Sequence, residues 1–229
     1  MWLLPIYRRL GLAVSVALVA GLALSWLVLW SFAELADEVM EGESRRIDST
    51  VLLTIDRNTP AWLETPMLAV TALGYYYVVI PVLLVAVGMF LRYGRRLSAL
   101  LLTVATCGSV LLTTVLKVVF ERARPELVDS GYTATFYSFP SGHATVAVGF
   151  YGTLTLLVAY NLRGPARWFV AALGIALILL IGFSRLYLGV HYPTDILAGY
   201  LSALLWISTV GTVLFTLHSL RRGEHGRKP

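Results

Sequence analysis

Long apolar runs separated by short charged segments dominate this chain. A helix needs about 20 apolar residues to cross the hydrocarbon core, and six runs reach or approach that length. They lie at about 10–32, 67–91, 97–120, 143–160, 168–188 and 193–218, and the fourth is the shortest. The pattern predicts an all-α fold, an integral membrane bundle of six transmembrane helices. Little sequence remains for a soluble domain, so we expect residues 1–229 to form one membrane domain.

The segment 33–66 between the first two runs is polar, with eight acidic residues and three arginines. Four apolar residues recur in it at helical spacing: Ile47, Val51, Leu52 and Ile55. This stripe predicts an amphipathic helix lying at the outer membrane surface. A lid or lipid-gathering helix beside an active site is the alternative. Gly74-Tyr75-Tyr76-Tyr77, further along, is typical of an interfacial aromatic belt.

The first run follows Arg8 and Arg9 and so has some features of a signal peptide. It is longer than the usual 7–15-residue signal core, and no small-x-small cleavage site follows it. We therefore expect a retained helix. Cys107 is the single cysteine, which excludes a disulfide within the chain, and it is expected to serve as a small apolar side chain.

Composition supports the membrane class, because 58% of residues are apolar and 14% are charged, against about 45–50% and 25% in soluble domains. The net charge of +5 could suggest a nucleic-acid partner. Its distribution indicates membrane topology instead, because basic residues favour cytoplasmic loops. The segments predicted inside hold Arg8, Arg9, Arg92, Arg95, Arg96, Arg163, Arg167, Arg221, Arg222, Arg227 and Lys228. We expect a plasma-membrane protein with cytoplasmic termini, no nucleic-acid partner, and the segments 121–142 and 189–194 on the extracytoplasmic face.

Three groups of polar residues interrupt the apolar pattern near that face. Lys117 is followed, after six residues, by Arg124-Pro125. The spacing is about two helical turns, which would place both cations on one side if the helix continued. Pro125 disfavours helical geometry at Arg124, so we expect the chain to turn there. Taken alone, a lysine near a span end commonly snorkels toward the headgroups.

The second group is Pro140-Ser141-Gly142-His143, directly before an apolar helix. Ser141 is a suitable N-cap and Gly142 allows close approach to the backbone. Free amides at a helix start bind anions. The alternative is an ordinary cap with an interfacial histidine.

The third group is Ser184-Arg185, then five residues, His191, then three residues, Asp195. The planar fork of an arginine matches phosphate oxygens. His191 and Asp195 are four residues apart across a predicted helix start at Pro193. The carboxylate can therefore accept a proton from one ring nitrogen and leave the other free to attack. An arginine–aspartate pair with a satisfied histidine is the structural alternative.

Together the three groups resemble the signature of the type 2 phosphatidic acid phosphatase superfamily, and every motif position matches. The region that carries the matching motifs covers residues 117–195, about a third of the chain. The resemblance implies a phosphatase that needs no metal or other cofactor. It implies that His191 is the nucleophile, that Asp195 orients it, and that His143 is the general acid and then the general base. The phosphate would be held by Lys117, Arg124, Ser141, Gly142 and Arg185.

The implied substrate is a lipid phosphate or pyrophosphate reached from the bilayer. Phosphatidic acid, phosphatidylglycerophosphate, diacylglycerol pyrophosphate and undecaprenyl pyrophosphate all fit this description. A vanadium haloperoxidase-like enzyme is one alternative, because that branch of the superfamily would hold vanadate with the same residues. A non-catalytic lipid-binding or transport bundle is the other.

Overall fold

A computed structural model describes residues 4–128 and 131–225, with backbone alone for 4–11, 13, 218 and 220–225. The described chain is helical and contains no strand. Its longer helices are α1 (Leu4–Glu41), α4 (Tyr76–Arg92), α5 (Arg96–Phe120), α8 (Pro165–Tyr187) and α9 (Pro193–His225). Shorter ones are α2 (Arg45–Asn58), η1 (Ala61–Leu63), α3 (Glu64–Ala72), α6 (Gly142–Val146), the π-helical η2 (Ala147–Gly152) and α7 (Thr153–Tyr160).

Five of the described helices are long and apolar enough to cross a membrane, and a sixth span exists if a bent pair is counted as one. The predicted all-α membrane fold is therefore confirmed. That residues 1–229 form a single domain stays a prediction. Many large apolar side chains point outward, as Trp26, Leu84 and Leu111 do with exposed fractions of 71%, 65% and 65%. Such exposure suits a surface that faces lipid tails.

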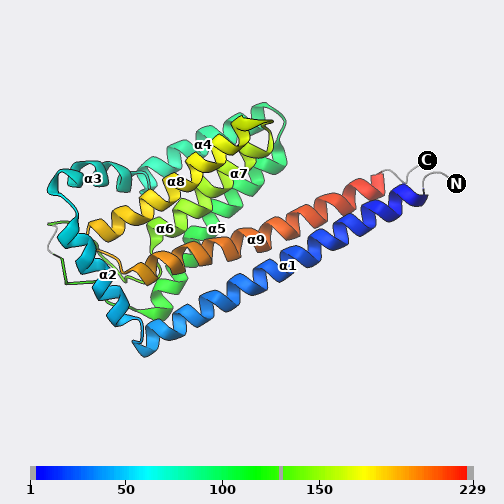
Figure 1. Cartoon of the computed structure of the whole chain (residues 1–229). Helices are drawn as coiled ribbons and strands as arrows, with labels where there is room; N and C mark the ends of the chain where they lie inside the picture. Colours follow the sequence, from blue (N-terminus) through cyan, green and yellow to red (C-terminus); the bar gives the residue numbers. More distant parts are fainter. Residues whose placement is uncertain (1–3, 129–130, 226–229) are drawn as a thin grey trace.

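α1 and α9 lie side by side along most of their lengths and bring the two described chain ends together (Figure 1). Small side chains allow this close contact. A Cβ at Gly21 would stand 2.1 Å from Thr212 Oγ1, and one turn further on Ser25 Oγ lies 2.9 Å from Ser208 Oγ. Six of the basic residues that are predicted to lie on the inner side are near the chain ends, and their side chains are outside the described part of the structure: Arg8, Arg9, Arg221, Arg222, Arg227 and Lys228.

Two predicted spans differ from the structure in extent or continuity, and a third keeps its bounds but is not one regular helix. The first helix continues past residue 32 to Glu41, because Ala36 and Val39 extend its buried face against Phe139 and Ala198. The span predicted at 67–91 is two helices, α3 and α4, bent by 47° around residues 73–75. The span predicted at 143–160 is one path built from α6, η2 and α7. A π-helical turn of this kind often accompanies a functional site.

The segment 33–66 contains a helix, α2, where an amphipathic helix is expected, and its place at the outer membrane surface stays a prediction. Leu52 is fully buried, whereas Ile47 is 67% exposed. Asp48, next to Ile47, has no exposed surface at all. The Asp48 carboxylate is buried where it has cationic and hydroxyl partners inside the protein. Apolar periodicity cannot reveal such partners.

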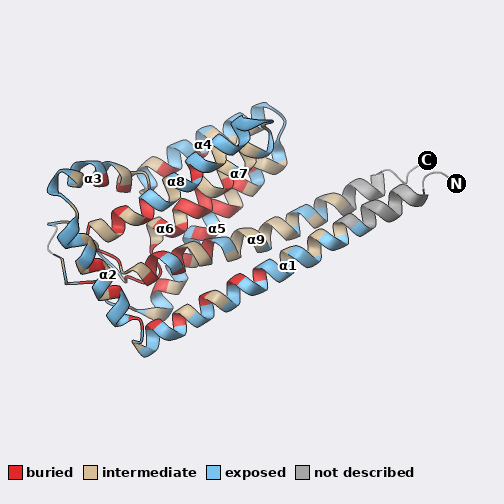
Figure 2. Ribbon diagram, viewed as in Figure 1, coloured by how far each residue is buried: buried red, intermediate tan, exposed pale blue. Residues whose placement is uncertain are grey.

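Buried side chains gather where α6 meets the start of α9 and the end of α8 (Figure 2). This region lies at the end of the bundle away from both termini (Figure 1). The loop segments 121–128 and 131–141 and the turn from Leu188 to Tyr192 close the same end. The predicted polar motifs are carried by these elements.

Candidate active site

The pair His191 and Asp195 spans the turn between α8 and α9. Pro193 begins α9, so Asp195 lies in its first turn and points back at the histidine. His191 Nδ1 is 3.3 Å from Asp195 Oδ2. The carboxylate fixes the proton on Nδ1 and leaves the Nε2 lone pair available. His191 is 2% exposed and Asp195 is fully buried.

Burial, assisted by the charges of Arg185 and Arg124, lowers the pKa of His191 to about 3, against the opposing effect of Asp195. The desolvated imidazole therefore resists taking a second proton. A neutral ring at physiological pH retains the lone pair that a nucleophile needs.

Three further donors reach the same carboxylate. Ser138 Oγ donates a very short hydrogen bond to Asp195 Oδ2. The amide of Tyr192 donates to the same oxygen at 2.8 Å. Arg122 Nη1 binds the other oxygen, Oδ1, at 2.6 Å. Asp195 is therefore held on both oxygens.

Arg124 follows the end of α5 and binds backbone carbonyls of its own loop. It donates to the carbonyls of Phe136 at 2.8 Å and Thr135 at 3.0 Å. Its Nη1 donates to the Val190 carbonyl at 2.7 Å and lies 3.2 Å from His191 Nε2. The guanidinium is thus beside the nitrogen that Asp195 leaves free.

Lys117, in the last turn of α5, is 9% exposed. Its Nζ donates a very short hydrogen bond to the Tyr137 carbonyl and one of 3.2 Å to the Ser138 carbonyl. Rather than snorkel toward the headgroups, the lysine side chain turns inward to the loop that carries Ser138. A buried ammonium needs such partners, since burial of a charge is costly.

Arg185 lies at the end of α8 and is 2% exposed. Its Nη1 donates to Thr71 Oγ1 at 2.7 Å and to Tyr132 Oη at 3.2 Å. Tyr132 Oη also makes a very short hydrogen bond with Tyr75 Oη. Ser184, its motif neighbour, donates to the Ile181 carbonyl within the helix instead.

The start of α6 also contributes residues to the site. His143 packs against the ring of Tyr75 with centroids 4.6 Å apart, so Tyr75 is turned inward rather than into an interfacial belt. Ser141 occupies the N-cap position but makes no side-chain cap bond, which corrects that expectation. Its amide instead donates to the Asp195 carbonyl at 2.9 Å.

Three buried polar atoms of this site have no hydrogen-bond partner within the described chain: Ser141 Oγ, His143 Nε2 and Arg185 Nε. Buried groups of this kind normally find partners. A hydroxyl, an imidazole nitrogen and a guanidinium N–H are together suited to the oxygens of a phosphoryl ester. Among the described residues, no group of three or more His, Cys, Asp or Glu could hold a metal ion.

The structure connects most of the predicted residues directly. Contacts run from Lys117 through the loop to Asp195, His191 and Arg124, and the Ser141 backbone joins them. His143 and Arg185 are linked to each other through Tyr75 and Tyr132.

Sequence reasoning missed Asp48, Thr71, Arg122, Tyr132, Ser138 and Thr194. Arg122 and Ser138 lie inside the motif region, but their residue types alone gave no sign of a role.

This arrangement of an oriented imidazole among cations belongs to a known class. Residues 98–219 match the PAP2 superfamily, and the chain belongs to that superfamily. It is similar to an undecaprenyl-diphosphatase of Sulfolobus acidocaldarius, with 32% identity over 207 residues, 87% of this chain and 95% of that relative. It is also similar to phosphatidylglycerophosphatase B of Bacillus subtilis, with 33% identity over 147 residues, 63% of this chain and 71% of that relative.

A solved structure shares the fold. The crystal structure of a transmembrane PAP2-type phosphatidylglycerolphosphate phosphatase from Bacillus subtilis matches with a TM-score of 0.75 and 27% identity, over 82% of this chain and 94% of that one. The present chain is accordingly a multi-pass membrane phosphatase of the PAP2 superfamily that acts on lipid phosphates.

Proposed function

We propose that this chain hydrolyses the phosphomonoester or pyrophosphate headgroup of a membrane lipid through a phosphohistidine on His191. One observation carries the proposal: Asp195 Oδ2 lies 3.3 Å from Nδ1 of the buried ring, while Nε2 lies 3.2 Å from the Arg124 guanidinium. The carboxylate directs the lone pair on Nε2 toward the cation that would hold the phosphate.

In the first step, Nε2 of His191 attacks phosphorus in line with the scissile P–O bond. The N–P bond forms as the bond to the leaving oxygen breaks. His143 protonates that oxygen, so the lipid leaves as an alcohol or as a lipid monophosphate. Asp195 stabilises the positive charge on the phosphorylated ring.

The phosphoryl oxygens are held by cations from three elements and by the start of α6. Lys117, Arg124 and Arg185 supply charge, and Ser141 with the Gly142 amide supplies neutral donors. Groups already fixed by carbonyls, as Arg124 and Lys117 are, need little reorganisation when charge develops in the transition state. Their three charges support a mechanism without a metal ion.

In the second step, a water attacks the phosphohistidine. His143, now neutral, accepts the proton of the water, and the N–P bond breaks to regenerate His191. Inorganic phosphate leaves with the charge that the cations had balanced, and the cycle closes with no net change in the enzyme.

The substrate would be a lipid whose tail stays in the bilayer. The names of the relatives favour phosphatidylglycerophosphate and undecaprenyl pyrophosphate among the candidates. The basic loops favour cytoplasmic termini in the plasma membrane and a site on the extracytoplasmic face. The headgroup would then approach from the outer leaflet.

Purified protein assayed against a panel of lipid monophosphates and pyrophosphates tests the proposal. We expect phosphate release on at least one of them and, with ³²P in the headgroup, an acid-labile labelled intermediate after rapid quench. His191→Ala should lose both turnover and label. Label that persists in this variant would remove His191 as the nucleophile, and failure on the whole panel would contradict lipid phosphatase activity.

A further inference from the structure

A buried polar cluster joins the outer helix α2 to the proposed catalytic carboxylate. It consists of Asp48 on α2, Arg122 after α5, and Thr194 with Asp195 at the start of α9. Asp48 and Asp195 are both fully buried. Arg122 lies between them, with Nη2 2.7 Å from Asp48 Oδ2 and Nη1 2.6 Å from Asp195 Oδ1.

Asp48 is also bound to the start of α9 itself. Its Oδ1 accepts from the Thr194 amide at 3.1 Å, and its Oδ2 accepts from the Thr194 hydroxyl at 2.7 Å. The same hydroxyl accepts from Arg122 Nη1 at 2.8 Å. The residue next to Asp195 is therefore anchored to α2 by two hydrogen bonds and to Arg122 by a third.

The two oxygens of Asp195 consequently have different partners. Oδ2 accepts from His191, Ser138 and the Tyr192 amide, whereas Arg122 is the one donor to Oδ1 among the described contacts. Arg122 is shared with a second carboxylate, and it stacks over the ring of Tyr192 at 4.4 Å. Without Asp48, the whole charge of Arg122 would be directed at Asp195, which would weaken the hold of this carboxylate on the imidazole.

We propose that Asp48 is a positioning residue of the phosphatase, which acts through Arg122 and Thr194 to set the orientation and effective charge of Asp195. The helix α2 then serves as a fixed brace of the active site rather than as a moving lid. This inference rests on the proposed function, because it requires that Asp195 orients a nucleophilic His191.

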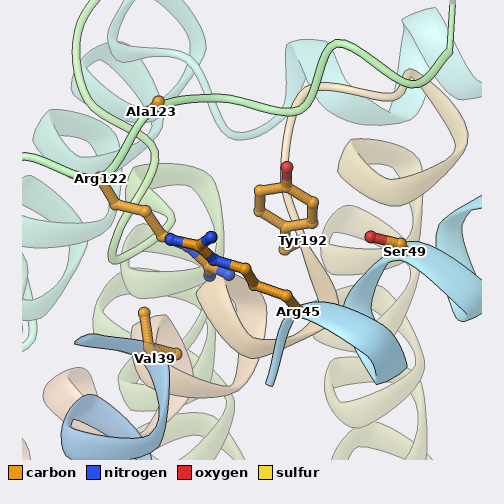
Figure 3. A pocket seen from close by; sticks show the side chains of 6 residues that line it. All are labelled: Val39, Arg45, Ser49, Arg122, Ala123 and Tyr192. Carbon is orange, nitrogen blue, oxygen red and sulfur yellow. The ribbon is translucent and has the colours of Figure 1, made fainter. Parts of the chain in front are cut away.

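The surface above the cluster supplies a matched control. Arg122 forms part of a hollow of about 340 Å³ whose other lining residues are Val39, Arg45, Ser49, Ala123 and Tyr192 (Figure 3). Ser49 follows Asp48 on α2 and faces this hollow, but no interaction joins it to Arg122, Thr194 or Asp195 among the described contacts. A change at Ser49 therefore alters the same helix without altering the cluster.

The experiment compares Asp48→Asn with Ser49→Ala in the full-length protein, with kcat, KM and the quenched ³²P intermediate as readouts. Asparagine keeps the shape and one acceptor but loses the charge. We expect kcat to fall about 10- to 100-fold with KM within about twofold of wild type, the loss that is typical when an outer partner of a functional group is removed. Ser49→Ala should match wild type in all three readouts.

A second variant covers the possibility that Asp48→Asn does not fold. Thr194→Val removes the hydroxyl between Asp48 and Arg122 but leaves both charges, and we expect a smaller loss, about 3- to 10-fold in kcat with KM unchanged. Wild-type kcat in folded Asp48→Asn, or in Thr194→Val when the first variant is unfolded, would overturn the inference. A loss confined to KM would also overturn it, since that indicates a role in substrate binding.

The two proposals fail in different ways. If His191→Ala retains activity or label, the proposed mechanism fails and the role of Asp48 fails with it. If His191→Ala is inactive while Asp48→Asn behaves as wild type, only the inference about α2 fails.

Discussion

Replacing Gly74 by alanine tests the role of His143 without removing any polar group from the site. Gly74 lies at the bend between α3 and α4, where the chain passes directly over the imidazole. A Cβ built on Gly74 would stand 2.4 Å from His143 Cδ2 and 3.0 Å from its Cγ. Carbon atoms make their best contact at about 3.5–4.0 Å, so the ring must move by roughly 1 Å.

A displacement of that size matters for a general acid. A misplacement of 1 Å can cost about 10²-fold in rate, and general acid catalysis is worth about 10²–10⁴-fold in total. We therefore expect Gly74→Ala to lower kcat on a lipid monophosphate by about 10²-fold. His143→Ala should lose at least as much, because it removes the proton donor altogether.

The leaving group separates a lost acid from general damage. A lipid alkoxide needs a proton to leave, whereas p-nitrophenolate, with its much lower conjugate-acid pKa, leaves nearly unaided. In stopped-flow measurements, both variants should keep most of the p-nitrophenol burst, which reports phosphorylation of His191. Later turnovers should slow on either substrate, because His143 also activates the water.

Gly88→Ala is the control, since it makes the same substitution in α4 and a Cβ there would meet nothing within 4 Å. It should have wild-type kinetics, and thermal unfolding should show that all the variants are folded. The reasoning is refuted if Gly74→Ala hydrolyses the lipid at the wild-type rate. Equal slowing of the burst on p-nitrophenyl phosphate and of the first step on lipid would also count against His143 as the acid.

Three further predictions concern protonation, metals and topology. Because burial lowers the pKa of His191 to about 3, its ring should stay neutral from pH 8 down to pH 5. The ¹⁵N shifts of the imidazole, assigned with His191→Gln, should therefore show no titration in this range. A titration midpoint near pH 6.5 would refute this prediction. Activity should survive exhaustive chelation and be inhibited by orthovanadate, whereas turnover that is lost on chelation and restored by magnesium would exclude the metal-free mechanism. In a Cys107→Ser background, an impermeant thiol reagent applied to intact cells should label Thr133→Cys and leave Arg163→Cys unlabelled, and the reverse pattern would place the active site on the cytoplasmic face.

The sequence by itself determined the membrane class, the positions of the helices and the identity of the main candidate residues. Hydropathy is a local property, because each span must satisfy its own backbone hydrogen bonds and present apolar side chains to lipid. Motif spacing is also local: His191 and Asp195 are four residues apart, so one turn of chain brings them within 3.3 Å.

The tertiary structure decided what depends on residues distant in the sequence. The burial of Asp48 on α2 is one case: the apolar periodicity gives no sign of it, and it depends on Arg122 and Thr194, more than 70 residues away, which bind the carboxylate. The bend at Gly74 is another, since its reason is the His143 ring that lies against it. Ser141 has the residue type of a helix cap, but its hydroxyl makes no cap bond within the described chain. A polar side chain in a buried site is placed by partners that folding brings to it, and those partners are not encoded in any local pattern.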